Sequence, residues 1–408
     1  MHTVDKAVDC AAKLLAMRFG GTPQLTHPED LGGSGASMVI RCRVAPNPFL
    51  QERSVVIKQL PDFPSDGEQV DGPTADELAL IREIVAYQYT NTLPEHSRPG
   101  PLLLAYDVEK HMLILSDAGD GLNFTDVLLM NDADERKTAV RKLGRALGRM
   151  HATTYGGAES YNTLLRRQCQ KHGINPSTIV DSDIDIANLV REGVNLMEAN
   201  DVHIDPIVLQ YANEAAERQG RFDFRSFTPF DLTPDNIMLT KQVVFLDYEW
   251  ASFRDIAFDV ASVIVGFPQD HSTPALTEEE CTEFLSAWSA EVSHVWPETR
   301  DFDRVVDKLM APLIGWALMS LVMLHRGNKM SRKASRRIQH SSDTRYRGAA
   351  DIALLTPEQA SDLATTVDAI HRFALHYPNP RFEAVAKFTG ILSQILARQG
   401  GHPMRHEP

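Results

Sequence analysis

The apolar pattern of this chain changes its period near Gly119 and Gly121. Before these glycines, apolar and β-branched runs of strand length occur at residues 31–44, 54–60, 102–108 and 111–115. After them helical spacing dominates, as in the apolar stripe of residues 136–153. We therefore expect an α+β fold, with a small antiparallel β lobe at residues 1–118 and a large, mainly helical lobe at residues 119–408.

The segments around these strands are also assigned from their patterns. Helical spacing predicts an amphipathic helix at residues 4–19 and a second helix at residues 77–93. Proline, histidine and aspartate in residues 20–30 indicate a loop. In the helical lobe, we expect two helices within residues 177–218 and mostly helix within residues 277–399.

Composition excludes several classes of protein. An apolar fraction of 43% and a charged fraction of 24% are ordinary for a soluble globular chain. A net charge of −14 argues against a nucleic-acid partner. The cysteines are far apart in the sequence, which indicates free thiols in a reducing compartment; they are Cys10, Cys42, Cys169 and Cys281.

No membrane segment is expected. Acidic residues interrupt the N-terminus, so it does not resemble a signal peptide. The most apolar run, residues 309–324, is shorter than a bilayer span and contains Pro312, which favours a buried core helix over a membrane anchor. We therefore expect a cytoplasmic protein.

One segment opposes the acidic trend. Residues 326–347 are dense in lysine and arginine. Such a run is most often a solvated loop, but it also suits contact with a phosphate or an anionic ligand. The sequence leaves both interpretations open.

The strongest candidates for catalytic and metal-binding roles are Asp231, Asn236 and Asp247. Phosphoryl transfer from ATP needs one carboxylate to accept or orient a hydroxyl, and an amide oxygen and a second carboxylate to hold Mg²⁺. The spacing of Asp231 and Asn236 also ends the catalytic loop of protein kinases. A structural interpretation stays open, with Asp231 capping a turn before Pro234 and Asp247 as a solvated acid at a strand end.

Further candidates precede this set in the chain. Gly33, Ser34 and Gly35 lie in a turn between two predicted strands, where a backbone without bulky side chains can approach phosphates. Lys58 lies in an apolar strand, where an ammonium needs a counter-charge, and Glu83 on the following helix is the natural candidate. The alternatives are ordinary turn glycines and a lysine exposed on an edge strand.

An apolar strand then runs into a glycine-containing connector through Ser116 and Asp117. In a kinase of two lobes, such a connector offers backbone groups to the adenine edge. Each of these features is weak by itself, but they occur once each in the order that an ATP-binding kinase fold requires.

At this point the chain resembles the aminoglycoside phosphotransferase and choline kinase superfamily of small-molecule kinases. The resembling stretches are 143–153, 231–239 and 245–261, the last with an Asp-x-Ala-aromatic-Asp pattern that ends at Asp259. The resemblance implies a protein-kinase-like fold of two lobes that uses ATP and Mg²⁺.

The same resemblance implies roles for individual residues. Asp231 would be the catalytic base, and Asn236 and Asp247 would bind Mg²⁺. Lys58, paired with Glu83, would hold the ATP phosphates. Asp259 would bond the backbone of the catalytic loop, and His151 would pack beneath it.

The chain departs from the family directly before Asp231. Pro229 and Phe230 stand where the family usually has histidine and glycine. Proline fixes its own φ and restricts Thr228, so the geometry of the loop is in question.

The leading functional hypothesis is an ATP- and Mg²⁺-dependent kinase that phosphorylates a hydroxyl of a small molecule. The alternative is a nucleotide-binding pseudokinase or regulatory module without turnover, which Pro229 and Phe230 favour. A protein kinase is disfavoured, since the chain lacks His-Arg-Asp and Ala-Pro-Glu.

The acceptor is not defined by the sequence. Glu249 and Trp250 follow Asp247 closely and are candidate substrate residues, with the indole as a cation–π face for an aminoglycoside- or choline-like amine. The basic segment at residues 326–347 suits an anionic acceptor instead. The resemblance to the superfamily also implies a sugar-like acceptor as an alternative. We expect a monomer or a homodimer with a small-molecule partner.

Overall fold

A computed structural model describes residues 3–32, 37–60, 73–221, 223–268, 270, 273–338 and 355–406. The chain divides into two compact units. Unit 1 comprises residues 1–121, 156–183 and 238–252, and unit 2 comprises residues 122–155, 184–237 and 253–408. The placement of the lobe boundary at residue 118 stays a prediction.

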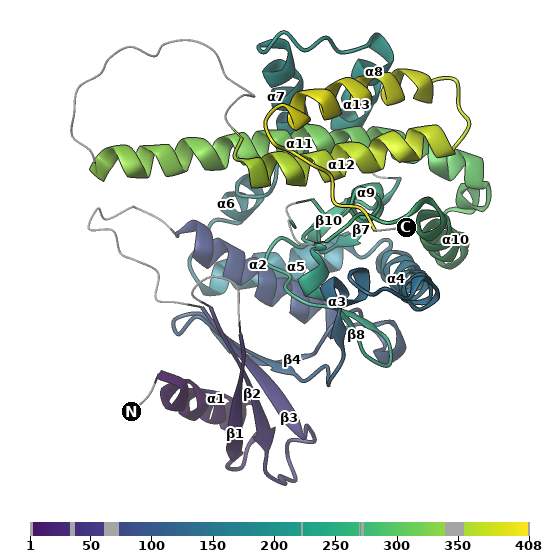
Figure 1. The fold of residues 1–408 in the computed structure, drawn as a ribbon. Helices are drawn as coiled ribbons and strands as arrows, with labels where there is room; N and C mark the ends of the chain where they lie inside the picture. The colour runs from purple at the N-terminus through teal and green to yellow at the C-terminus, as the bar shows by residue number, and fades with distance from the viewer. Residues whose placement is uncertain are drawn as a thin grey trace. The chain divides into compact units, whose positions relative to one another are not determined.

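Unit 1 is built around a five-stranded antiparallel sheet with the strand order β1-β2-β3-β5-β4 (Figure 1). Its strands are β1 (Leu25–Gly32), β2 (Met38–Val44), β3 (Ser54–Gln59), β4 (Leu103–Asp107) and β5 (Met112–Ser116). The amphipathic helix α1 (Thr3–Phe19) covers one face of the sheet, where Ala11 and Leu15 pack into one core with Cys42 and Val55. The expected helix and the four expected strand regions are therefore present.

Strand β1 corrects one expectation. Residues 25–30 were expected to be loop, because they contain His27 and Pro28, but they form an edge strand paired with β2. The edge accommodates them: Pro28 lies where the register shifts, and His27 has φ = 53°.

The other elements of unit 1 carry or support the candidate residues. Helix α2 (Ala75–Thr90) begins with a capping box between Thr74 and Glu77. The remaining elements are η1 (Glu95–Ser97), α5 (Ala158–Lys171), α6 (Pro176–Asp181), most of β8 (Ile237–Leu239) and β9 (Val243–Phe245). Helix α5 lies along α2, and the rings of Tyr89 and Tyr161 meet edge to face at 5.9 Å.

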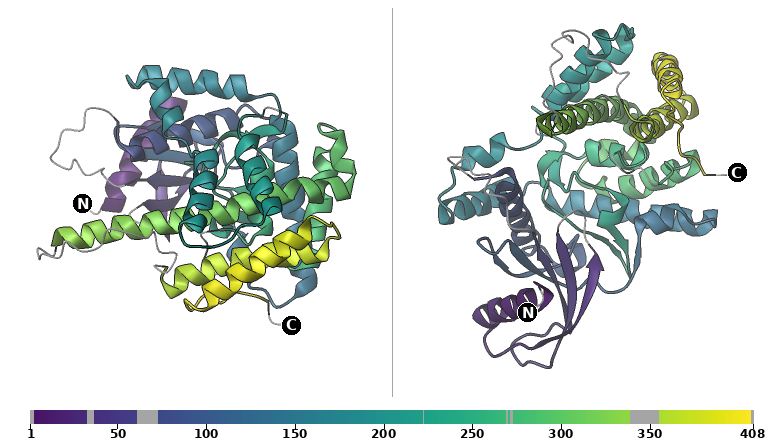
Figure 2. Two further views of the ribbon diagram at one scale, coloured as in Figure 1. Left: turned by 90° about the horizontal axis from the view of Figure 1, so that it is seen from above. Right: turned by 60° about the vertical axis from the view of Figure 1, so that its left-hand side comes forward.

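Unit 2 is mainly helical (Figure 2). Its helices are α3 (Phe124–Leu128), α4 (Ala133–Thr154), α7 (Ile186–Glu198), α8 (Pro206–Arg218), α9 (Ala257–Ile264), α10 (Glu278–Val292), α11 (Phe302–Ile338), α12 (Pro357–His376) and α13 (Phe382–Ala397). Its short elements are β6 (Leu122–Asn123), β7 (Arg225–Thr228), η2 (Pro234–Asn236), most of β10 (Ser252–Asp255) and η3 (Pro297–Arg300). The expected α+β class, with an antiparallel sheet and a large helical part, is confirmed.

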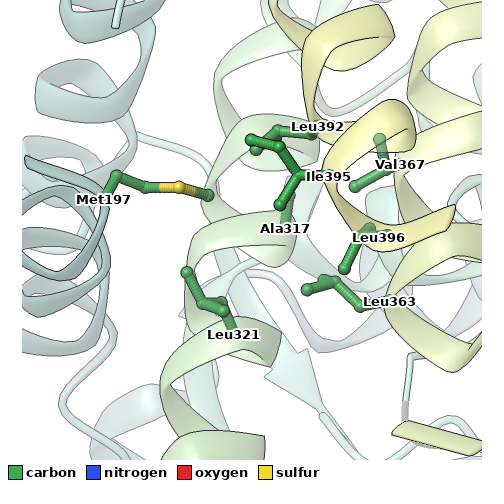
Figure 3. Close-up of a pocket in the computed structure, with 8 residues that line it drawn as sticks. All are labelled: Met197, Ala317, Leu321, Leu363, Val367, Leu392, Ile395 and Leu396. Atoms are coloured by element: carbon green, nitrogen blue, oxygen red, sulfur yellow. The ribbon is translucent and has the colours of Figure 1, made fainter. Parts of the chain in front are cut away.

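Helix α11 is the central helix of unit 2 and contacts α7, α8, α9 and α12. Its stretch Phe302–Gly327 is long and apolar enough to cross a membrane, but 89% of its most apolar window is buried. This burial agrees with the core helix expected at residues 309–324. Between α7, α11, α12 and α13 lies a small apolar cavity of about 10 Å³, as swept by the centre of a water molecule, which Met197, Ala317 and Leu396 help to line (Figure 3).

Two expectations in the helical region were wrong. Residues 177–218 contain α6, α7 and α8 and not two helices, because Asp185 and Asp205 each cap a separate helix start. The basic segment from residue 326 does not begin as a loop, since α11 continues to Ile338. The remainder of that segment, from residue 339, lies outside the described residues.

Candidate active site

Lys58 lies at the centre of an ion cluster in unit 1. Strand β3 places its side chain toward α2, where it is 11% exposed. The ammonium Nζ lies 2.9 and 3.1 Å from the two carboxylate oxygens of Glu83 and 2.8 Å from Oδ1 of Asp247. The structure therefore brings together three of the predicted residues from three distant parts of the chain.

The charges of this cluster depend on one another. Burial lowers the pKa of Lys58, but the carboxylates of Glu83 and Asp247 more than offset this, so the net shift raises the pKa above its ordinary value. Burial raises the pKa of Glu83 to about 7, although the Lys58 ammonium opposes this effect. The raised pKa keeps the Lys58 side chain protonated at neutral pH.

Asp247 stands two residues after the end of β9 in the left-handed region, with φ = 54°. Its neighbour Tyr248 is fully buried, and the Tyr248 ring lies 4.6 Å from the ring of Tyr87 on α2. Gly100 leaves room for Tyr248, since a Cβ at Gly100 would lie 2.4 Å from the phenol oxygen. These contacts hold Asp247 in a conformation that is costly for most residues other than glycine.

The predicted substrate residues Glu249 and Trp250 both contact a buried arginine that the sequence did not reveal. Arg82 donates a hydrogen bond from Nη1 to the carbonyl of Glu249 at 3.1 Å, and its guanidinium lies 5.8 Å from the Trp250 ring centroid. The indole therefore already has a cation partner within the chain. Burial, and then the charge of Asp247, raise the pKa of the Glu249 carboxyl.

The side chains of the predicted connector residues are engaged inside unit 1. Ser116 Oγ accepts a hydrogen bond from the backbone N–H of Leu102 at 2.8 Å. Arg41 Nε lies 3.0 Å from the carboxylate of Asp117, which also accepts from the N–H of Gly119 at 2.9 Å. These contacts fix the connector, and the contact of its backbone with an adenine edge stays a prediction.

The glycine turn is only partly seen. Gly33, Ser34 and Gly35 lie outside the described residues. Gly32, which precedes them, ends β1 with φ = 80°, a conformation that glycine adopts without strain. The role of the turn in phosphate binding stays a prediction.

Asp231 and Asn236 lie together in unit 2. The chain leaves β7, passes through the loop that holds Asp231, and enters the short helix η2, which ends at Asn236. Asn236 Nδ2 donates to Oδ2 of Asp231 at 3.3 Å. Because the amide nitrogen faces the carboxylate, the carboxamide oxygen is the group suited to bind a cation.

A buried hydrogen-bonded relay lies beside strand β7, which leads into this loop. Trp288 Nε1 donates to Nδ1 of His151 at 3.1 Å, so the proton of a neutral His151 resides on Nε2, which lies 3.2 Å from Oδ2 of Asp259. Ser226 of β7 donates to the carbonyl of His151 at 2.6 Å. Burial raises the pKa of Asp259, and the hydrogen bond from His151 opposes this shift.

The two predicted metal ligands have side chains of the type that magnesium prefers. Mg²⁺ is bound by one or two carboxylate or amide oxygens together with phosphate oxygens and water. Asp247 in unit 1 and Asn236 in unit 2 each carry an oxygen of this kind, and their joint binding of one ion stays a prediction. Among the described residues, no group of three or more His, Cys, Asp and Glu side chains is placed to hold a metal ion.

The antiparallel sheet with its Lys58–Glu83 pair, the helical unit and the Asp231–Asn236 loop define the class of phosphotransferases with a kinase-like fold. The model of the phosphotransferase enzyme family matches residues 95–302, about half of the chain. The chain belongs to this family, which confirms the resemblance seen in the sequence. No curated protein matches the chain.

Several solved structures are similar over most of their length. Choline kinase from Cryptosporidium parvum Iowa II is 12% identical, with 96% of this chain and 98% of that chain covered and a TM-score of 0.44. The choline kinase LicA from Streptococcus pneumoniae is 13% identical, with 88% and 98% covered and a TM-score of 0.42. APH(2")-IIa, solved in a ternary complex with streptomycin and ATP, is 11% identical, with 84% and 98% covered and a TM-score of 0.43.

Proposed function

We propose that this phosphotransferase is an ATP- and Mg²⁺-dependent kinase that phosphorylates a hydroxyl group of a small molecule in the cytoplasm. The observation that carries the proposal is the contact of one buried ammonium, Lys58 Nζ, with the carboxylates of Glu83 and Asp247. A buried charge is costly, and a cluster of three is retained most readily where its geometry serves a site.

Each residue has a chemical task in this proposal. Lys58 holds the phosphates of ATP, and Glu83 keeps the ammonium in place. Asp247 and Asn236 hold Mg²⁺, which when bound neutralises charge on the phosphates. Asp231 accepts or orients the proton of the acceptor hydroxyl, and Asn236 fixes the carboxylate through its 3.3 Å hydrogen bond.

Asp231→Ala tests the proposal. Loss of a general base lowers kcat by about 10²- to 10⁴-fold. The measurement is ATP consumption with Mg²⁺ and a panel of amines, sugars and antibiotics that carry hydroxyl groups. Asp235→Ala is the matched control, because it removes an exposed carboxylate from the same loop and should leave turnover unchanged.

Two results would contradict the proposal. Full turnover in the Asp231→Ala variant would show that this carboxylate takes no part in the reaction. Binding of Mg·ATP without turnover, across the whole panel and in the wild type, would support a nucleotide-binding module without catalysis.

A further inference from the structure

Phe230 directly precedes Asp231 and has a backbone conformation that its residue type rarely adopts. Its φ is 68°, in the left-handed region that glycine occupies without cost. A bulky side chain remains in this region only where its surroundings hold it there. The Phe230 side chain is correspondingly buried, at 4% exposed.

Two buried side chains contact the ring of Phe230. Trp316 of α11 stacks on it, with ring centroids 5.2 Å apart and planes inclined by 27°. The guanidinium carbon of Arg254, from β10, lies 4.8 Å from the ring centroid. Trp316 is itself fixed, because its Nε1 donates to the carbonyl of Phe258 at 2.7 Å.

We propose that Phe230 is a positioning residue for Asp231. The ring, held by Trp316 and Arg254, sets the direction in which the backbone enters the loop and so the place of the Asp231 carboxylate. Pro229 also restricts the path of the backbone into the loop, because its ring fixes its own φ directly before Phe230. The inference rests on the proposed function, in which Asp231 orients the attacking hydroxyl.

The contact also links the loop to a distant element. Trp316 lies within α11, the central helix of unit 2, so any shift of that helix near residue 316 reaches Asp231 through the stacked rings. Misplacement of a catalytic group by about 1 Å can lower a rate about a hundredfold. The position of Asp231 therefore depends on α11 as well as on its own loop.

Phe230→Gly separates positioning from stability. Glycine relieves the backbone strain but removes the ring, so we expect a folded variant whose kcat is about a hundredfold lower. The probe is phosphate release from Mg·ATP, first with water as acceptor and then with any acceptor found in the panel. Affinity for Mg·ATP, measured by titration, should stay within about twofold of the wild type, because no atom proposed to bind ATP changes.

Phe267→Leu is the matched control. Phe267 is another buried phenylalanine of unit 2 with a left-handed backbone, at φ = 54°, and its ring meets Phe124 edge to face. We expect this variant to be less stable but to keep wild-type kcat per folded molecule. Equal losses of kcat in both variants would show that any disturbed core lowers the rate, and would overturn the positioning role.

A second pair of variants covers the case in which Phe230→Gly does not fold. Trp316→Phe retains a stacked ring and should keep most of the turnover, whereas Trp316→Leu should lose about tenfold. Wild-type kcat in folded Phe230→Gly, or in both Trp316 variants, overturns the inference and leaves the proposed function intact. Absence of Mg·ATP turnover in the wild type instead defeats the proposed function, and this inference with it.

Discussion

Glu83 is almost fully buried, at 1% exposed, and its carboxylate bonds the Lys58 ammonium through both oxygens. Removing one partner of a buried ion pair costs about 3–5 kcal/mol, because the other charge is left without compensation. Replacing the whole pair with apolar residues, in contrast, is often neutral. Stability alone therefore does not explain why the chain has these charges at this place, whereas the proposed role in phosphate binding would.

The burial of Glu83 has a consequence for pH dependence. Its pKa is raised to about 7 in the folded protein from an ordinary value of 4.5, so the unfolded chain binds fewer protons between these values. The free energy of unfolding should therefore fall as the pH rises through this window, by up to about 3 kcal/mol. Denaturant unfolding at pH 5 and at pH 8 measures this difference, and Glu83→Gln should remove it.

Asp76→Asn is the matched control for this measurement, because it removes an exposed carboxylate from the same helix α2. The interpretation fails if Glu83→Gln and the wild type show the same change in the free energy of unfolding between the two pH values.

A contact between two side chains was predictable only where both residues belong to a known sequence motif. The sequence predicts the pairing of Lys58 with Glu83, because a strand lysine followed by a helix glutamate is typical of kinases. No sequence pattern predicted the contact between Arg41 and Asp117, which are 76 residues apart. The contacts of Arg82 were not predicted either. The Trp250 indole, which was expected to face a cationic acceptor, was therefore found against Arg82 within the chain.

At the scale of elements, helices α4 and α10 approach each other closely through glycines. A Cβ on Gly144 would lie 2.5 Å from the carbonyl oxygen of Phe284, and one on Gly148 would lie 2.8 Å from that of Trp288. A backbone atom cannot move aside as a flexible side chain can. The two glycines thus set the distance between the helices, and α4 also carries His151 of the buried relay.

Gly144→Ala should reverse the usual effect of alanine in a helix. Alanine normally stabilises a helix by about 1 kcal/mol relative to glycine, but here the added methyl group forces α4 and α10 apart and should cost about 1–3 kcal/mol. Gly390→Ala in α13 is the control, because the nearest atom to its Cβ would lie 3.8 Å away. Thermal unfolding should show opposite shifts of Tm; shifts of the same sign would contradict the proposed close contact.

Helices with a regular spacing of apolar residues were predictable from the sequence. Elements whose residues have a low local propensity for the structure they adopt were not. The stripe within residues 136–153 became α4, and the apolar run at residues 309–324 became the buried part of α11. Residues 25–30 of β1 were assigned to a loop because Pro28 and Asp30 have low strand propensity, and pairing with β2 overrides that propensity. The dense lysines and arginines from residue 326 onward favoured a loop, yet α11 continues to Ile338.

At the scale of the whole molecule, the reactivity of the cysteine thiols measures how well each unit stays folded, because both units contain buried cysteines. Cys42, Cys169 and Cys281 are buried, and burial raises the pKa of Cys42 to about 11 and that of Cys281 to about 12. Only a thiolate reacts quickly with disulfide reagents, so these thiols should stay protected while the protein is folded. Cys10, which is partly exposed, should react first.

A colorimetric disulfide reagent at pH 7.5 should therefore label about one thiol per chain in buffer and all four in denaturant. Cys10→Ser should abolish the rapid labelling. Rapid reaction of two or more thiols in buffer would show that at least one of the two cores opens readily.

The division of unit 1 into three stretches bears on how the protein is made. Residues 1–121 leave the ribosome first, but residues 156–183 and 238–252, which complete the unit, follow only after parts of unit 2. At about 5–20 residues per second, the sheet and α2 wait about 6–25 seconds for Asp247 and Tyr248 to emerge. Unit 1 therefore cannot finish folding in the order of its synthesis, and a nascent chain halted before residue 252 exposes the surface of α2 that Tyr248 later covers.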